Sequence, residues 1–361
     1  MVKSNGGVEP LRSNPSEKIP GMDIEQPDKL LQYLRETGHL AETESVRIEP
    51  LAGGVSNRTM LVRRESGPDW VVKQALPKLR VEVDWFCDPA RIHREAAGLR
   101  TLHELLPPGR VPEFVFEDKT HHLLGMTAVP EPHENWKQIL LTGIIDDRSI
   151  GQSAGILATI HTFAVRRASH FQHVFDDRSF FETLRLEPYY GFTAEQVPEA
   201  RSFLENLLQE TRGWQLTLVH GDYSPKNMLI HSGELVLLDH EVIHWGDPSF
   251  DGGFFLAHLL SKAHHLIDHR VRFLTAAQLW LMLYLLAVRQ EPWAEGLESR
   301  IIRQTLGCLL ARVRGRSQLE YLSPAERDLQ AAAVVELIRE PCDTFASLCL
   351  RFLELISDAA N

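Results

Sequence analysis

Residues 218–251, LVHGDYSPKNMLIHSGELVLLDHEVIHWGDPSFD, constrain the fold most strongly, because two apolar, strand-like segments in this stretch each lead into an aspartate. Asp222 follows the first segment and Asp239 ends the second. Burying a carboxylate costs several kcal/mol unless it is paired with a cation or held by hydrogen bonds. The chain must therefore bring these aspartates to a cleft where a cation can reach them.

The second half of this stretch predicts a β-hairpin. The segments MLIH and ELVLLD flank Ser232 and Gly233, which suit a tight turn. Such a hairpin would place Asn227 beside Asp239. Amide and carboxylate oxygens suit magnesium, which completes its coordination with waters and substrate phosphates, and Asp222 remains free to accept a proton from a substrate hydroxyl. A cluster of turn-forming residues is the alternative, but the spacing H-G-D-x₄-N followed by D-x-E-x₄-G-D-P-x₂-D is too specific for it.

The rest of the chain divides into a β-rich part and a helical part. Residues 46–64, 69–76 and 111–126 have strand-like patterns, and Asp88 with Pro89 predicts the start of a helix between them. After TAVPEP at residues 127–132, most segments have a helical apolar spacing. These patterns predict an α+β protein, with a disordered polar tail at 1–22, a β-rich lobe at 23–128 and a helical lobe at 129–361.

Lys73 and Glu95 form a second candidate group in the β-rich lobe. Glu95 lies on the apolar stripe of the predicted helix, so it needs a cationic partner, and Lys73 on the preceding strand is the natural one. A purely structural salt bridge is the alternative.

Gly53 and Gly54 allow backbone N–H groups to approach phosphate oxygens, or they form an ordinary turn. The sequence contains no G-x-x-x-x-G-K-[ST] motif, so it has no P-loop.

Composition and charge exclude several classes of function. The 361 residues include 38 basic and 49 acidic ones, a net charge of −11, so we expect neither nucleic acid nor membrane as a partner. Most of the excess acid lies in the second part, which favours a neutral or cationic partner there.

The longest apolar run, residues 279–288, predicts a core helix. Four scattered cysteines and the lack of a visible signal peptide indicate a cytoplasmic protein, of unknown oligomeric state.

These motifs together resemble those of the aminoglycoside phosphotransferase family, which is related to choline kinases, methylthioribose kinases and protein kinases. The resemblance covers about residues 46–260 and includes GGVSN, Lys73, Glu95, ATIH, HGDYSPKN and LLDHEVIHWGDPSFD. It implies a protein-kinase-like two-lobe fold, with a small antiparallel sheet and one helix in the first lobe and a larger, mainly helical second lobe. It also implies transfer of the γ-phosphoryl group of ATP, with Mg²⁺, to a hydroxyl of an aminoglycoside-like or other small-molecule acceptor.

The resemblance also implies roles for individual residues. Lys73 would hold the α- and β-phosphates and would be oriented by Glu95. Asp222 would be the catalytic base, and Asn227 and Asp239 would bind magnesium.

Further positions would bind the nucleotide or support the catalytic loop. Asp251 would tie this loop to the helix behind it, and His220 would orient it. The nucleotide-binding residues would be a loop over the phosphates and a hinge at 126–129 beside adenine; they are Gly53, Gly54, Val55, Ser56, Asn57, Met126 and Ala128.

Some features leave alternatives open. His240 stands where relatives usually carry Phe or Trp, and Lys226 could reach the γ-phosphate or face solvent. His258, His265 and His269 share a predicted helical face that could bind zinc, line a polar pocket or lie at the surface. Trp136 and Trp245 could be pocket walls or core. Residues 83–102 and 135–143 also resemble methylthioribose kinases. A nucleotide-binding regulator without turnover is the remaining alternative.

Overall fold

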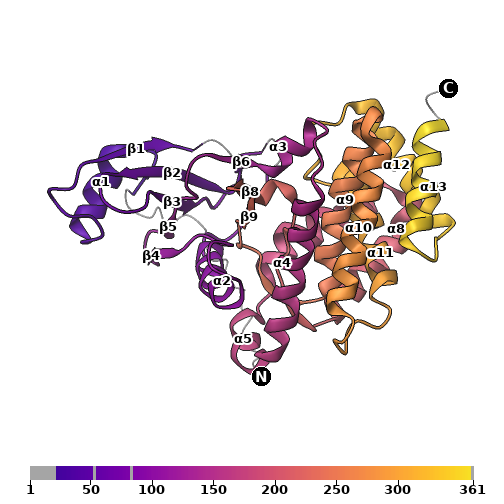
Figure 1. Ribbon diagram of the computed structural model, residues 1–361, viewed down its shortest axis with the longest axis horizontal. Coiled ribbons are helices and arrows are strands. Elements are labelled where there is room, and N and C mark those ends of the chain that lie inside the picture. The colour runs from indigo at the N-terminus through magenta and orange to yellow at the C-terminus, as the bar shows by residue number, and fades with distance from the viewer. Residues whose placement is uncertain (1–21, 52–53, 82–83, 359–361) are drawn as a thin grey trace, which may run out of the picture.

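A computed structural model describes residues 22–51, 54–81 and 84–358, so the tail predicted at 1–22 lies almost entirely outside the described residues. A five-stranded antiparallel sheet with α1 forms one end of the molecule, and a bundle of helices forms the other (Figure 1). The strand order is β1-β2-β3-β5-β4. The elements of this end are α1 (Pro27–Glu36), β1 (Val46–Pro50), β2 (Asn57–Arg64), β3 (Trp70–Ala75), α2 (Arg91–Leu105), β4 (Phe114–Asp118) and β5 (Leu123–Thr127).

The sheet buries side chains on both of its faces. Met60 of β2 and Val72 of β3 belong to the same apolar cluster as Leu34 of α1. Leu124 of β5 instead joins Leu99 of α2 in the main core of the molecule. Because successive side chains of a strand point to opposite faces, α1 covers one face and α2 the other, and α2 thereby lies between the sheet and the helical part.

Helix α2 begins later than the sequence predicted. Its first residue is Arg91 and its N-cap is Ala90. The Asp88 carboxylate accepts a hydrogen bond from the Ala90 N–H at 2.9 Å, and the Asp88 carbonyl accepts one from the Arg91 N–H at 3.2 Å. Residues 88–91 therefore form a turn ahead of the helix, and this turn replaces the predicted cap.

The predicted hairpin consists of β8 (Met228–His231) and β9 (Glu234–Leu237). Ser232 and Gly233 between them have φ angles of 52° and 76°, the left-handed pair that a two-residue hairpin turn with matched twist requires. A third strand, β6 (His133–Asn135), pairs with β8. The chain thus leaves the large sheet at the end of β5 and joins the hairpin almost at once, and we retain 128/129 as the proposed boundary between the lobes.

The helical part surrounds α9, which is buried along nearly its whole length. Two short strands, β7 (Thr217–Val219) and β10 (His244–Gly246), pair beside it. Figure 1 shows α9, α10 and α11 side by side with α4. The helices are α3 (Trp136–Leu141), α4 (Asp147–Arg166), α5 (Ala168–Phe175), α6 (Ser179–Phe181), a π-helix (Glu182–Gly191), α7 (Phe192–Gln196), α8 (Arg201–Gly213), α9 (Pro248–His265), α10 (Arg270–Val288), α11 (Leu297–Arg314), α12 (Pro324–Arg339) and α13 (Phe345–Asp358).

Helix α10 contains the longest apolar run of the sequence. Among the described residues, Ile267–Val288 is the one helical stretch long and apolar enough to cross a membrane, and 44% of its apolar window is buried here. Phe273, Trp280 and Tyr284 are fully buried in the main core, as expected for a core helix. The four cysteines carry free thiols, also as expected. The predicted two-lobe arrangement is confirmed.

Candidate active site

Lys73 on β3 joins the two lobes at the centre of the site. Its Nζ lies 2.5 Å from Glu95 Oε1 on α2 and 3.1 Å from Asp239 Oδ1, just after β9. Burial alone would lower the pKa of Lys73, but the Asp239 and Glu95 carboxylates outweigh it and raise the pKa, so the ammonium stays charged. The predicted contact between Lys73 and Glu95 is present, and Asp239 is its second partner.

Three carboxylates meet beside this lysine. One oxygen each of Glu95, Asp239 and Glu241 lies within 4.8 Å of the others. Burial and the neighbouring carboxylates raise the pKa of Glu95 and of Glu241, whereas Lys73 outweighs burial at Asp239 and keeps its pKa low. The second oxygen of Glu95 is buried without a hydrogen-bond partner. A set of hard oxygens, one of them without a hydrogen-bond partner, fits a divalent cation such as magnesium.

The backbone after β9 turns sharply at Asp239. Its φ angle of 66° lies in the left-handed region, which few residues other than glycine adopt. Aspartate tolerates this conformation better than most side chains. With this turn, the carboxylate of Asp239 meets Lys73 and that of Glu241, two residues later, meets Arg91 at 3.1 Å.

Asp222 lies on the loop after β7, and two donors hold it. Asn227 Nδ2 and Arg185 Nη2 each lie 2.7 Å from Asp222 Oδ2. Among the described residues, Oδ1 has no hydrogen-bond partner and remains available to accept a proton. The amide nitrogen of Asn227 faces Asp222, so its oxygen is the atom left for a metal ion. The Asn227 carbonyl also accepts the Leu238 N–H at 2.9 Å, which brings Asn227 next to Asp239 as the hairpin predicted.

Asp251 at the start of α9 holds the loop that carries Asp222. Its carboxylate accepts the N–H groups of His220 and Gly221 at 2.7 and 2.8 Å, and it also contacts His161 at 3.2 Å. Burial alone would raise the pKa of Asp251, but His161 and the loop amides outweigh it and lower the pKa. The Asp251 carboxylate therefore ties the loop to α9, as the family resemblance implied.

His220 supports the same loop. Burial lowers its pKa, so the ring is neutral, and its Nδ1 accepts the Asp222 N–H at 3.2 Å. Its Nε2 lies 3.1 Å from His240 Nδ1, so His240 takes part in a buried polar contact that Phe at this position could not make. Both contacts favour the predicted orienting role over that of a proton donor.

The predicted phosphate loop is only partly exposed. Ser56 and Asn57 are buried, and Asn57 Nδ2 lies 3.4 Å from Glu241 Oε2. Gly54 has a φ of 102°, which favours glycine, and the side chain of Val55 is exposed. Gly53 lies outside the described residues. Gly54 and Val55 are thus the described residues best placed to cover a nucleotide.

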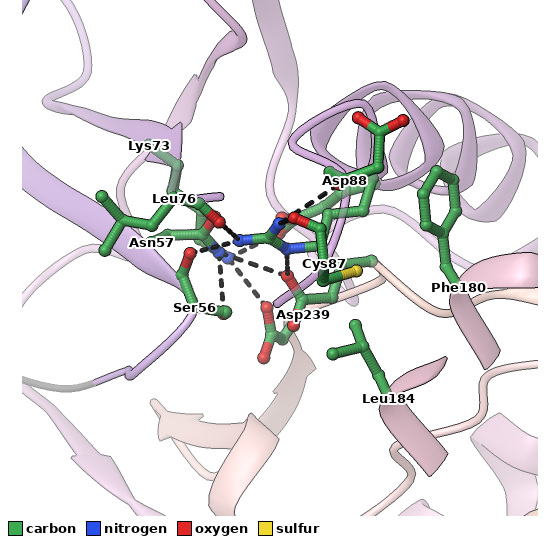
Figure 2. Close-up of polar contacts among 12 residues, drawn as sticks. Ser56, Asn57, Lys73, Leu76, Cys87, Asp88, Phe180, Leu184 and Asp239 are labelled. Atoms are coloured by element: carbon green, nitrogen blue, oxygen red, sulfur yellow. Dashed lines mark hydrogen bonds and ion pairs between the residues drawn. The ribbon is translucent and has the colours of Figure 1, made fainter. Parts of the chain in front are cut away.

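Arg91 explains why Ser56 and Asn57 are buried. Its fully buried guanidinium donates to Glu241 and to the carbonyls of Ser56, Leu76, Cys87 and Asp88. Figure 2 labels the four residues whose carbonyls accept these hydrogen bonds. One side chain of α2 therefore joins the phosphate loop, the end of β3 and the segment after Asp239.

The predicted hinge differs from expectation in one hydrogen bond. Met126 pairs with Val71 of β3 and Phe114 of β4, inside the sheet. The Ala128 N–H donates to the Asp69 carbonyl at 2.7 Å and is therefore already engaged. If adenine binds here, Val129 is the next backbone donor along the chain. The roles of Met126 and Ala128 stay predictions.

Arg91 and Arg185 were absent from the sequence-based prediction. Arg91 immediately precedes the apolar stripe of α2, which gives no sign of its burial. Arg185 lies in the π-helix, whose sequence has no signal for contact with Asp222. Glu241 was visible in the D-x-E spacing, but its pairing with Arg91 depends on tertiary structure.

The histidine and tryptophan alternatives are resolved by burial and helix bounds. Helix α9 ends at His265, so His269 no longer shares a face with His258. His265 instead pairs with Glu326 at 2.7 Å. Among the described residues, the group able to hold a metal contains none of these histidines, and the zinc alternative is wrong. Trp136 and Trp245 are core residues, 1% and 3% exposed.

The five-stranded sheet, the helical part and the position of Lys73 and Asp222 between them define a protein-kinase-like fold. The model of the phosphotransferase enzyme family matches residues 47–275, and the chain belongs to this family.

Known relatives are distant. Methylthioribose kinase 2 and methylthioribose kinase 1 of Oryza sativa subsp. japonica are each 24% identical over 267 and 263 residues, or 64% of this chain and 61% of each relative. The match thus spans less than two thirds of their length. The choline kinase of Cryptosporidium parvum Iowa II is 12% identical with a TM-score of 0.54, covering 90% of this chain and 99% of that one. The streptomycin–ATP complex of APH(2″)-IIa is 15% identical with a TM-score of 0.50, covering 88% and 99%. These two structures show the fold alone.

Proposed function

We propose that this chain transfers the γ-phosphoryl group of ATP, in the presence of magnesium, to a hydroxyl group of a small molecule. The observation that carries the proposal is the bridge from Lys73 to Glu95 and Asp239. Proteins with this fold need a charged lysine at the phosphates and a carboxylate for the metal, and both must be in place together. Membership of the phosphotransferase family supports the proposal.

The nucleotide would lie between the sheet and the segment after β9. Lys73 would hold its α- and β-phosphates, oriented by Glu95. Gly54 and Val55, with Gly53, would cover the phosphates, and residues 126–129 would contact adenine. ATP rather than GTP as the donor is part of the proposal.

A magnesium site fits the residues present. Asp239 would hold the ion, with Glu241 and the amide oxygen of Asn227 as further oxygen donors. Bound there, the ion would neutralise charge on the phosphates of the nucleotide. Lys226 is exposed, and its charge also favours the ionised form of Asp239, so it lies near the same oxygens.

Asp222 would act on the acceptor. Its Oδ1 would accept the proton of the attacking hydroxyl, while Asn227 and Arg185 hold Oδ2 and fix the direction of the carboxylate. Catalysis would come chiefly from positioning and from neutralising charge.

The test begins with thermal unfolding in the presence of ATP, with and without magnesium. We expect ATP to raise the Tm only when magnesium is present, and Asp239→Ala to lose this shift. Asp328→Ala is the matched control, because that carboxylate is 74% exposed and far from the Lys73 contacts. If no nucleotide changes the Tm of the unaltered protein, the proposed function is wrong.

A further inference from the structure

Basic side chains gather in the helical part, among helices α3, α9 and α11. We call Lys137 of α3, His258 and Lys262 of α9, and Arg312 of α11 the basic cluster. His258, Lys262 and Arg312 are buried, and the side chain of Lys137 is 14% exposed. The cluster contrasts with the net charge of −11 of the whole chain.

Lys262 is the most unusual member of the cluster. It is fully buried, and its one hydrogen bond among the described residues goes to the His258 carbonyl at 3.3 Å. It forms no ion pair with any described carboxylate. A buried charge without a partner is strongly unfavourable, and burial together with Lys137 and Arg312 lowers the pKa of Lys262 to about 7. The site therefore lacks a negative charge.

The cations of the cluster converge on two tyrosine rings. The Nζ atoms of Lys262 and Lys137 lie 5.4 and 5.9 Å from the centre of the Tyr321 ring. Arg312 Nη1 donates to Tyr189 Oη at 2.8 Å. Glu320 is the one described carboxylate at an ion-pair distance from the cluster; it contacts Lys137, and its side chain is 65% exposed. The positive charges of Lys137, Lys262 and Arg312 thus have a single carboxylate nearby among the described residues, and that carboxylate is largely exposed to solvent.

The cluster is connected to the catalytic loop at two points. The Tyr189 ring lies 5.8 Å from the Arg312 guanidinium and 5.9 Å from that of Arg185, which pairs with Asp222. Asn135, the N-cap of α3, donates to the Lys226 carbonyl at 2.8 Å. The cluster is thus linked to both Asp222 and Lys226 of the catalytic loop, from the helical part of the molecule.

We infer that the acceptor is an anion: a small hydroxyl compound carrying a carboxylate, phosphate or sulfate group that binds Lys262, Lys137 and Arg312 while its hydroxyl reaches Asp222. This inference rests on the proposed function and narrows its substrate class. It reverses the expectation from overall charge, since a cationic acceptor would be repelled by the unpaired lysine.

The first test compares acceptors that differ mainly in charge. ATP consumption and product mass are measured with glycerate against glycerol and gluconate against glucose, and with methylthioribose, choline and kanamycin. We expect glycerate and gluconate to be preferred over glycerol and glucose by about 10-fold or more in kcat/KM. A difference of this size corresponds to one hydrogen bond to a charged group. Preference for kanamycin, choline or a neutral sugar overturns the inference.

The second test changes the cluster alone. Lys262→Met should fold, because it removes a buried charge and keeps the length of the side chain. We expect it to raise KM for the anionic acceptor by about 10-fold or more, with kcat and the KM for ATP nearly unchanged. Lys29→Met is the matched control, because Lys29 is exposed on α1. An unchanged acceptor KM in Lys262→Met contradicts the inference.

A third measurement separates this inference from the proposed function. Sodium sulfate, compared with sodium chloride at equal ionic strength, should raise the Tm of the unaltered protein by more than it raises the Tm of Lys262→Met, because only the general salting-out effect of sulfate acts on the variant. This holds even if ATP and magnesium produce no shift and the proposed function fails. Equal sulfate effects in both proteins, or none in either, show that the cluster does not bind anions.

Discussion

Replacing Arg91 by methionine should destabilise the protein more than any other arginine substitution in α2. The guanidinium of Arg91 is fully buried and lies 3.1 Å from Glu241. It also donates to four backbone carbonyls, those of Ser56, Leu76, Cys87 and Asp88. Methionine has a similar length and fills most of the same space, so the change removes charge and hydrogen bonds rather than volume.

The magnitude follows from what the substitution leaves behind. The carboxylate of Glu241 keeps only a long contact of 3.4 Å with Asn57 and is buried beside Asp239 and Glu95. Breaking a buried ion pair by removing one partner costs about 3–5 kcal/mol. Adding Glu241→Gln removes the uncompensated charge, so the double variant should recover at least about 1 kcal/mol of that loss.

Urea unfolding followed by circular dichroism measures these differences in the free energy of unfolding. Arg100→Met is the control on the same helix, because Arg100 is 44% exposed and its ion pair with Glu117 should contribute about 1 kcal/mol or less. If Arg91→Met costs no more than Arg100→Met, or if the double variant is as unstable as the single one, the buried pair does not stabilise the junction of the lobes.

Two further predictions concern Asp222 and Lys262. Asp222→Asn should lower kcat by about 10²–10⁴-fold but keep the ATP-dependent rise in Tm, and an unchanged kcat would show that Asp222 is not the base. The pKa of Lys262 is about 7 in the folded protein, below its usual value of 10.5. Between pH 7 and 10.5, Lys262 therefore carries a proton in the unfolded chain that it lacks in the folded protein. The stability contributed by Lys262 should therefore rise with pH over this window and be lowest at pH 7 and below. Lys262→Met should consequently be more stable than the unaltered protein by several kcal/mol at neutral pH, with the difference shrinking toward pH 10; a pH-independent difference in urea unfolding would contradict this.

Much of the nucleotide side of the site could be predicted from sequence, because local patterns determine it. A lysine within a β-strand and a glutamate on an apolar helix stripe predicted the 2.5 Å contact between Lys73 and Glu95. The hairpin turn at Ser232 and Gly233 likewise brings Asn227 to the backbone next to Asp239. In both cases short-range periodicity and a single turn fix which side chains meet.

The remaining features depend on contacts between distant segments. The burial of Ser56 and Asn57 follows from Arg91 and Glu241, which are far from them in sequence. Arg185 reaches Asp222 from a π-helix that no periodicity in the sequence indicates. The basic cluster draws on α3, α9 and α11, and each of its residues alone resembles an ordinary surface or helix position.

The expectation of a neutral or cationic partner rests on the net charge of the second part of the chain and not on how the individual acidic residues are used. Near the catalytic loop, Asp222 is paired with Arg185, and Asp251 accepts the loop amides. Asp247 caps α9 by accepting from the Ser249 N–H at 3.0 Å. These carboxylates already have donors, so they offer little to a cationic acceptor. At physiological salt, the interaction between exposed charges is largely screened beyond about 8 Å, whereas buried charges are screened much less. The electrostatic effect of the unpaired Lys262 on a bound acceptor should therefore outweigh that of distant acids on the surface. On the inference of an anionic acceptor, the sign of the local unpaired charge, rather than the net charge of the lobe, would select the acceptor.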